Sequence, residues 1–200
     1  MSRRWFPWLC LALVAYGVYD WARSHRVYQT EGMVVAEAPL QTTARGAAFE
    51  MNGVSVTPLA SYEIRALVLG VEAYRFDEGA AVAPLDVAVG WGPMSDSGVL
   101  NKLNISQGNR WYYFRSKSGE GMPLPVEVLS RHSANMHLIP ANQEINTQLK
   151  RLRVGQVATL KGRLVNVARA DGWRWSSSLS RDDAGGGSCE LMYVEMVETP

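Results

Sequence analysis

The sequence predicts a mainly β domain with short helices, arranged as an OB-like barrel, and three observations point to this fold class. From Gly53 onward, apolar and polar residues alternate mostly with the two-residue period of strands. A helix pattern at residues 142–152 interrupts the strands, and a hairpin signal, Asp171-Gly172, follows it. This order resembles an OB-type barrel, in which a helix lies between the third and fourth strands. A β-sandwich with helical insertions is the alternative arrangement.

The first 26 residues predict one N-terminal transmembrane helix that anchors the protein. A basic start precedes an apolar stretch at residues 5–22. About 18 residues make a helix of roughly 27 Å, close to the roughly 30 Å of a hydrocarbon core. Residues 1–26 are therefore interpreted as a membrane anchor, with a signal peptide cleaved near Ala15-Tyr16-Gly17 as the alternative. We expect a single-pass protein of the bacterial inner membrane whose body lies in the periplasm.

The rest of the chain divides into a linker at residues 27–52 and a β-rich, OB-like domain at residues 53–200. The linker is rich in Ala, Thr, Gly and Glu and lacks a clear period. Strand-like runs in the domain fall at residues 61–75, 84–92, 109–116, 132–141, 157–170, 173–179 and 189–198.

The clearest helix follows the fourth strand-like run. Asn142 is placed to cap its N-terminus. Ile145, Leu149 and Leu152 share one face at intervals of four and three residues, and Gly155 ends the pattern. We therefore expect this helix to bury its apolar face against the strands.

The hairpin near the C-terminus has a predicted register. If Asp171-Gly172 forms a two-residue turn, Ala170 faces Trp173 and Ala168 faces Trp175 across the two strands. This register places both tryptophans on the apolar face of the hairpin. The arginines then lie on the opposite face.

Charge and cysteine content limit the function classes. Without residues 1–26, the chain keeps 16 basic and 18 acidic residues, a net charge of −2. A body without basic excess argues against a dedicated nucleic-acid binder. Only Cys10 and Cys189 are present, and Cys10 lies in the predicted anchor, so the body has no internal disulfide framework.

The stretch "HSANMHLIPA", residues 132–141, holds two of the three histidines. A spacing of five residues puts His132 and His137 on opposite faces of a strand, so no metal site and no cofactor are predicted. We expect Ala134, Met136 and Leu138 to point inward and Ser133, Asn135 and His137 outward. The candidate ligand-binding residues are His132, Asn135 and His137, with Trp91 and Met94 from the "WGPMSDSG" loop.

Three functions remain open, and a binding or scaffolding domain is favoured over an enzyme. The first alternative is an envelope hydrolase that uses His132 or His137 with a carboxylate such as Asp86. The second is polyanion or nucleic-acid binding through a basic hairpin. Its candidate residues are Lys161, Arg163, Arg169 and Arg174. A protein partner or an anionic envelope ligand fits an exported body better than a nucleic acid does.

Several segments resemble those of a family of small bacterial membrane-anchored proteins. They are "PLDVAVGWGPMSDSGVLNKLNISQGNRWYYF", "HSANMHLIPA" and "DGWRWSSSLSRDDAGGGSCELMYVE", and the resemblance covers residues 61–198. That family has no established activity, so the resemblance implies an envelope protein and no catalytic residues.

Overall fold

The structure of the protein is a computed structural model. It describes residues 6–24, 31–117, 119, 121–180 and 189–200. Strands make up 46% of the chain and helices 19%, which confirms the prediction of a mainly β fold with short helices.

Helix α1 (Phe6–Ser24) covers most of the predicted anchor. Within the described residues, none of the helices combines the length and the apolar character needed to cross a membrane. Residues 1–5 and 25–30, which include the ends of the predicted anchor and the start of the predicted linker, lie outside the described residues. The membrane anchor stays a prediction.

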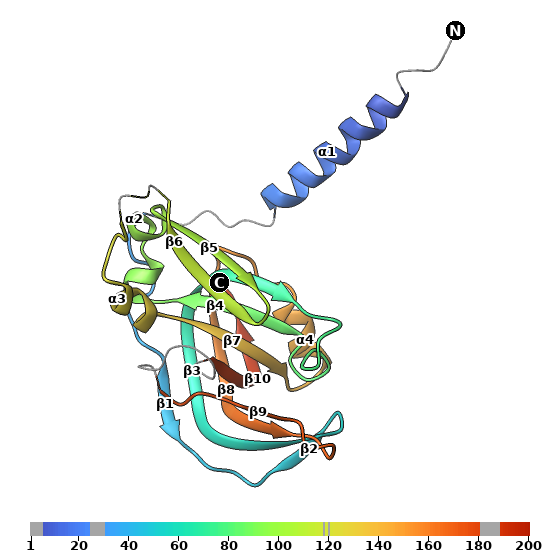
Figure 1. Ribbon diagram of the computed structural model, residues 1–200, viewed down its shortest axis with the longest axis vertical. Coiled ribbons are helices and arrows are strands. Elements are labelled where there is room, and N and C mark those ends of the chain that lie inside the picture. Colours follow the sequence, from blue (N-terminus) through green and yellow to red (C-terminus); the bar gives the residue numbers. More distant parts are fainter. Residues whose placement is uncertain (1–5, 25–30, 118, 120, 181–188) are drawn as a thin grey trace.

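Five strands form a sheet that closes on itself (Figure 1). In order around the sheet they are β3 (Val54–Ala73), β4 (Leu85–Gly90), β7 (Ser133–Pro140), β10 (Glu190–Glu198) and β8 (Val157–Ala168), and β8 pairs back with β3. The pairing of β7 with β10 is parallel, whereas the other four pairings are antiparallel. Closure satisfies the backbone groups that an open sheet edge would expose.

Strand β3 closes the sheet because it is long and bent. Its residues up to Leu67 pair with β8, and those from Leu67 onward pair with β4. The register shifts between Val68 and Gly70 in the pairing with β4 and between Pro58 and Ala60 in the pairing with β8, and such irregularities let a strand bend. Figure 1 shows β3 and β8 curving together.

Apolar side chains fill the inside of the closed sheet. Ala134, Met136 and Leu138 of β7 all lie in this core, which confirms the predicted inward face of the strand. Helix α4 (Gln143–Leu149) adds Ile145 and Leu149 to the same core. The predicted cap is confirmed too, because Oδ1 of Asn142 accepts a hydrogen bond from the N–H of Ile145 at 2.9 Å.

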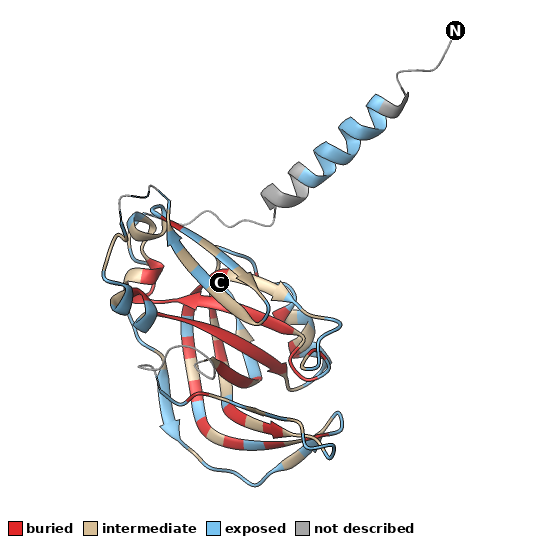
Figure 2. Ribbon diagram, viewed as in Figure 1, coloured by how far each residue is buried: buried red, intermediate tan, exposed pale blue. Residues whose placement is uncertain are grey.

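A long insertion between β4 and β7 covers the outside of these two strands. It comprises the 3-10 helix η1 (Gly92–Ser95), α2 (Ser97–Leu100), the hairpin of β5 (Leu103–Gly108) and β6 (Trp111–Ser116), and α3 (Val126–Arg131). Apolar residues of the hairpin pack on Leu67, Leu69 and Ala88. Strands β4 and β7 are therefore buried on both faces, as Figure 2 shows.

Part of the predicted linker packs on the barrel. Strands β1 (Leu40–Thr43) and β2 (Phe49–Met51) both pair with β3. Val35 is 1% exposed and belongs to the barrel core. The structured body thus begins before Gly53.

The predicted register of the C-terminal hairpin is wrong by one residue. Trp175 of β9 (Arg174–Ser176) faces Val167, and Arg174 faces Ala168. The N–H of Gly172 bonds to the carbonyl of Arg169 and Gly172 has a φ of +94°, so the turn contains three residues rather than two. A shift of one residue exchanges the two faces of a strand. Trp175 consequently packs outside the barrel beside Val167.

Candidate functional site

Asp86 and His137 face each other on the outer surface of β4 and β7. They are direct partners in the antiparallel register, and Nδ1 of His137 lies 2.9 Å from Oδ1 of Asp86. Among the described residues, Nδ1 nevertheless lacks a partner with hydrogen-bond geometry, so the two groups are in close contact without a directed hydrogen bond. The Asp86 side chain is only 1% exposed.

Arg110 brings a positive charge to this pair from the turn between β5 and β6. Gly108 and Trp111 are cross-strand partners, so Asn109 and Arg110 form a two-residue turn. Both turn residues have a positive φ, +53° and +67°. The second position of such a turn favours glycine. An arginine there carries backbone strain, and strain of this kind is often retained where the side chain has a role.

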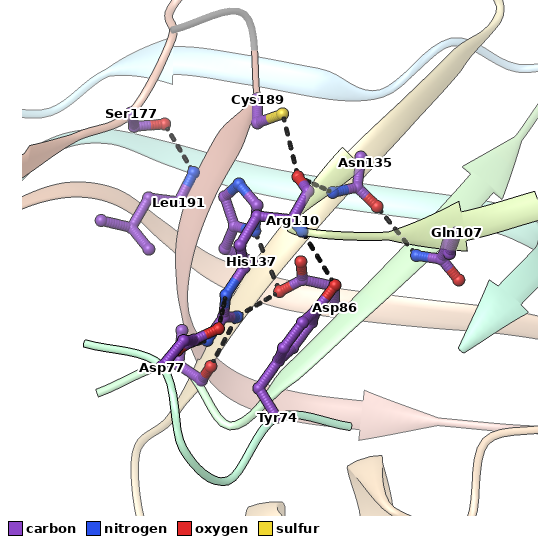
Figure 3. Close-up of polar contacts among 11 residues, drawn as sticks. Tyr74, Asp77, Asp86, Gln107, Arg110, Asn135, His137, Ser177, Cys189 and Leu191 are labelled. Carbon is purple, nitrogen blue, oxygen red and sulfur yellow. Dashed lines mark hydrogen bonds and ion pairs between the residues drawn. The ribbon is translucent and has the colours of Figure 1, made fainter. Parts of the chain in front are cut away.

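The guanidinium group of Arg110 is hydrogen-bonded through all three of its nitrogens (Figure 3). Nε and Nη2 donate to the two carboxylate oxygens of Asp77 at 2.8 and 2.7 Å. Nη1 donates to Oδ1 of Asp86 at 2.7 Å and to the carbonyl of Ala83 at 2.8 Å. Two parallel bonds to one carboxylate are the strongest arrangement available to an arginine.

Aromatic rings lie against the same guanidinium. Its Cζ atom is 3.8 Å from the ring centre of Tyr74 and 5.3 Å from that of Trp175. Trp175 also contacts the imidazole of His137, with ring centres 4.6 Å apart. A Cβ on Gly79 would lie 2.6 Å from the Trp175 ring, so this close approach requires a glycine. The cation therefore lies within cation–π distance of two aromatic rings.

The backbone of the turn is held as firmly as the side chain. The N–H of Arg110 donates to the hydroxyl of Tyr74 at 2.9 Å. The side-chain amide of Asn135 donates to the carbonyl of Arg110 at 2.9 Å and accepts a bond from Gln107 at 2.8 Å. The Sγ atom of Cys189 lies 4.0 Å from the same carbonyl oxygen.

The ion pairs of Arg110 favour the charged forms of Asp77 and Arg110. Hydrogen bonds from Arg110 lower the pKa of Asp77. Burial alone would lower the pKa of Arg110, but the hydrogen bonds and charges of Asp77 and Asp86 outweigh it, so that pKa is raised. Oδ2 of Asp86 has no hydrogen-bond partner among the described residues.

The residues that contact Arg110, together with His137, are called the Arg110 cluster. Two of the five predicted ligand-binding residues belong to it. Asn135 and His137 lie on the outer face of β7, as predicted, although the insertion covers them. His132 lies elsewhere: it ends α3, and its Nδ1 is 2.7 Å from the carbonyl of Val128. Trp91 is buried in the barrel core, and Met94 is buried under the β5–β6 hairpin.

The predicted basic residues do not form one cationic face. Lys161 pairs with Glu63 at 2.9 Å and Arg163 with Glu195 at 3.2 Å. Arg169 pairs with two carboxylates and stacks on Trp173, 4.6 Å from its ring centre. Arg174 makes no ion pair within the described part of the chain. Most of this positive charge is therefore matched by nearby carboxylates.

The Asp86–His137 contact has the distance that acid–base chemistry requires. Among the described residues, however, no hydroxyl or thiol is hydrogen-bonded to His137. The described residues also contain no group of three His, Cys, Asp or Glu side chains able to hold a metal ion. What the cluster does hold is a planar cation.

Sequence reasoning did not identify Tyr74, Asp77, Gln107 or Arg110 as site residues. All four lie in or beside loops, where the alternation of apolar and polar residues does not indicate which way a side chain points. One signal was present: "GNR" directly precedes the apolar residues of the run 109–116, and glycine and asparagine are common in tight turns.

Comparisons with protein-family models, curated proteins and solved structures found no match to this chain. The resemblance to membrane-anchored envelope proteins stays an expectation.

Proposed function

We propose that this protein is a membrane-anchored periplasmic binding module built on an OB-type barrel. The order β3-β4-β7-β10-β8, the parallel β7–β10 pair and the position of α4 between β7 and β8 support the OB assignment. OB barrels bind ligands on the face of their second and third strands, between the loops that flank it. Here that face belongs to β4 and β7 and carries Asp86 and His137.

Two segments flank this face and together form a surface that we call the rim. They are the β3–β4 loop, residues 74–84, and residues 169–175 of the β8–β9 hairpin. Arg169 pairs with Glu78 at 2.7 Å, and the Trp175 ring packs on Gly79, so the two segments are tied to each other. A rim held in this way is preorganised for contact with a partner.

The observation that carries the proposal is the exposure of Phe76 at the rim. Its side chain is 98% exposed, although its neighbours in the loop are held by ion pairs. Covering a phenylalanine contributes about 2 kcal/mol through apolar burial. An aromatic residue on a rigid loop is the kind of side chain that anchors a protein interface.

The charge of the rim favours a protein partner over a polyanion. The two segments carry three basic and three acidic residues, so their charges cancel: Arg75, Arg169 and Arg174 against Asp77, Glu78 and Asp171. A polyanion would be repelled as much as attracted. A protein or peptide with mixed charge meets both signs.

Site-specific photo-crosslinking from the rim tests the proposal. A photoreactive phenylalanine analogue replaces Phe76 in the full-length chain, expressed in cells, and the matched control places it at Tyr113, which is 47% exposed on β6. We expect a discrete protein adduct from position 76 that position 113 does not give and that Trp173→Ala weakens. Lipid or polysaccharide adducts from position 76, or the same adducts from both positions, would contradict a protein-binding rim.

A further inference from the structure

We infer that the pocket holding Arg110 is a receptor for the guanidinium group of a partner's arginine, and that Arg110 occupies it until that arginine replaces it. The inference rests on the proposed function and names the chemistry of the partner, an exposed arginine-bearing segment. We call the pocket, formed by Tyr74, Asp77, Ala83, Asp86 and Trp175, the guanidinium receptor.

The receptor is shaped for a planar cation rather than for any positive charge. Asp77 accepts two parallel hydrogen bonds along one edge of the guanidinium plane. The ring of Tyr74 covers one face at 3.8 Å. A lysine ammonium is compact and strongly hydrated, so it cannot form the two parallel bonds to Asp77 or stack as a plane on the Tyr74 ring.

The tip of the hairpin is separable from its base. Strands β5 and β6 form their own two-stranded sheet, outside the closed sheet. Leu103, Ile105 and Phe114 anchor the hairpin toward its open end, and Tyr112 packs in the same cluster nearer the tip. The turn residue Arg110, beyond Tyr112, is held by hydrogen bonds. The tip can therefore leave the receptor while the base stays packed on the barrel.

The resident arginine carries a backbone cost that an incoming arginine would not carry. Arg110 has a φ of +67°, a backbone conformation that a non-glycine residue adopts at a cost. An arginine in an extended partner segment carries no such strain. Release of the tip relaxes the turn, so strain favours exchange.

The receptor is partly exposed to solvent, and it contains an acceptor atom that lacks a hydrogen-bond donor. Asp77 is 37% exposed and Arg110 is 16% exposed, so the bidentate edge faces the rim. Asp86 is 1% exposed, and its Oδ2 atom has no hydrogen-bond partner among the described residues. A buried acceptor that lacks a donor favours a further donor.

Chemical rescue tests the receptor in the full-length chain. Arg110→Gly removes the side chain but suits the turn, because glycine is the favoured residue at that position. Thermal unfolding of this variant is followed with methylguanidinium and with methylammonium at equal concentration. We expect methylguanidinium to raise the Tm of Arg110→Gly by about 4 °C at ten times its Kd, and methylammonium to have no specific effect. Adding Asp77→Asn to Arg110→Gly should abolish the rescue.

Hydrogen exchange of the wild-type chain tests displacement and does not depend on the variant folding. Methylguanidinium at millimolar concentration should accelerate exchange at the tip, residues 108–111, and leave the base of the hairpin unchanged. Arg115→Ala, which removes an exposed arginine of β6, should respond like the wild type.

Equal responses to the two cations, or unchanged exchange at the tip, overturn the receptor. These outcomes are separate from the crosslinking at Phe76. If crosslinking at Phe76 gives a protein adduct but methylguanidinium does not rescue Arg110→Gly, the rim binds a partner and the guanidinium receptor is wrong. If rescue occurs without an adduct, the receptor is supported and the protein-binding rim is wrong.

Discussion

Arg110 and Asp86 form a 2.7 Å ion pair between a hairpin turn and a barrel strand that are 24 residues apart in the sequence. The carboxylate is 1% exposed and the guanidinium 16% exposed. Charges removed from water to this extent interact strongly with each other and strongly disfavour the loss of either one. This pair therefore couples the insertion to the barrel.

Removing the cation should destabilise the fold. We expect Arg110→Ala to lower the free energy of unfolding by about 3 kcal/mol, because it leaves the Asp86 carboxylate buried without its ion-pair partner. Urea unfolding measures this value. The matched variant Arg115→Ala, at an exposed position, should stay within about 0.5 kcal/mol of the wild type. Equal stabilities of the two variants would contradict a structural role for the pair.

Stability should depend on the charge of Asp77 at acid pH. Hydrogen bonds from Arg110 lower the pKa of Asp77 in the folded state, so its contribution is present above the unfolded pKa of about 4 and is lost as the pH falls through the folded value. The stability difference between the wild type and Asp77→Asn should be constant from about pH 7 to pH 5 and shrink below about pH 4. Urea unfolding across this range checks it. A difference that persists unchanged toward pH 2 would show that the charge of Asp77 does not matter.

Tyr112 should weaken the fold at alkaline pH. Burial raises its pKa to about 12, and its hydrogen bond with Ser133 offsets part of that rise. Between about pH 10 and pH 12 the unfolded chain loses a proton that the folded chain keeps, so stability falls as the pH rises. Tyr112→Phe should show a shallower decline from about pH 9 to pH 11 in urea unfolding. Identical slopes for the two proteins would exclude this residue as the cause.

Gly162 should tolerate no side chain. A Cβ at this position of β8 would meet the carbonyl of Tyr193 on β10 well inside van der Waals contact, so the two strands would have to separate. We expect Gly162→Ala to cost about 3 kcal/mol of unfolding free energy. Gly108→Ala is the matched control, because nothing lies within 4 Å of its added Cβ. Comparable losses in both variants would point to a general effect of glycine replacement instead.

Features with a local cause were predictable from the sequence. The inward set of β7 and the Asn142 cap of α4 were both correct, because each depends only on strand alternation or on the first turn of a helix. Alternation also placed Asn135 and His137 on one outer face of β7. It did not show that this face is covered, since the cover comes from a hairpin that precedes the strand in the chain.

Features set by distant contacts were not predictable. The side chain of Arg110 points to Asp77 and Asp86 because a two-residue turn aims it there and the insertion folds back over β4 and β7. Trp175 packs outside the barrel because a three-residue turn shifts its register by one position. The sequence by itself determined the period of the strands, the cap of the helix and the place, although not the length, of the C-terminal turn. Tertiary structure decided which charges meet, because the energy of a buried ion pair depends on distances that only the closed sheet brings about.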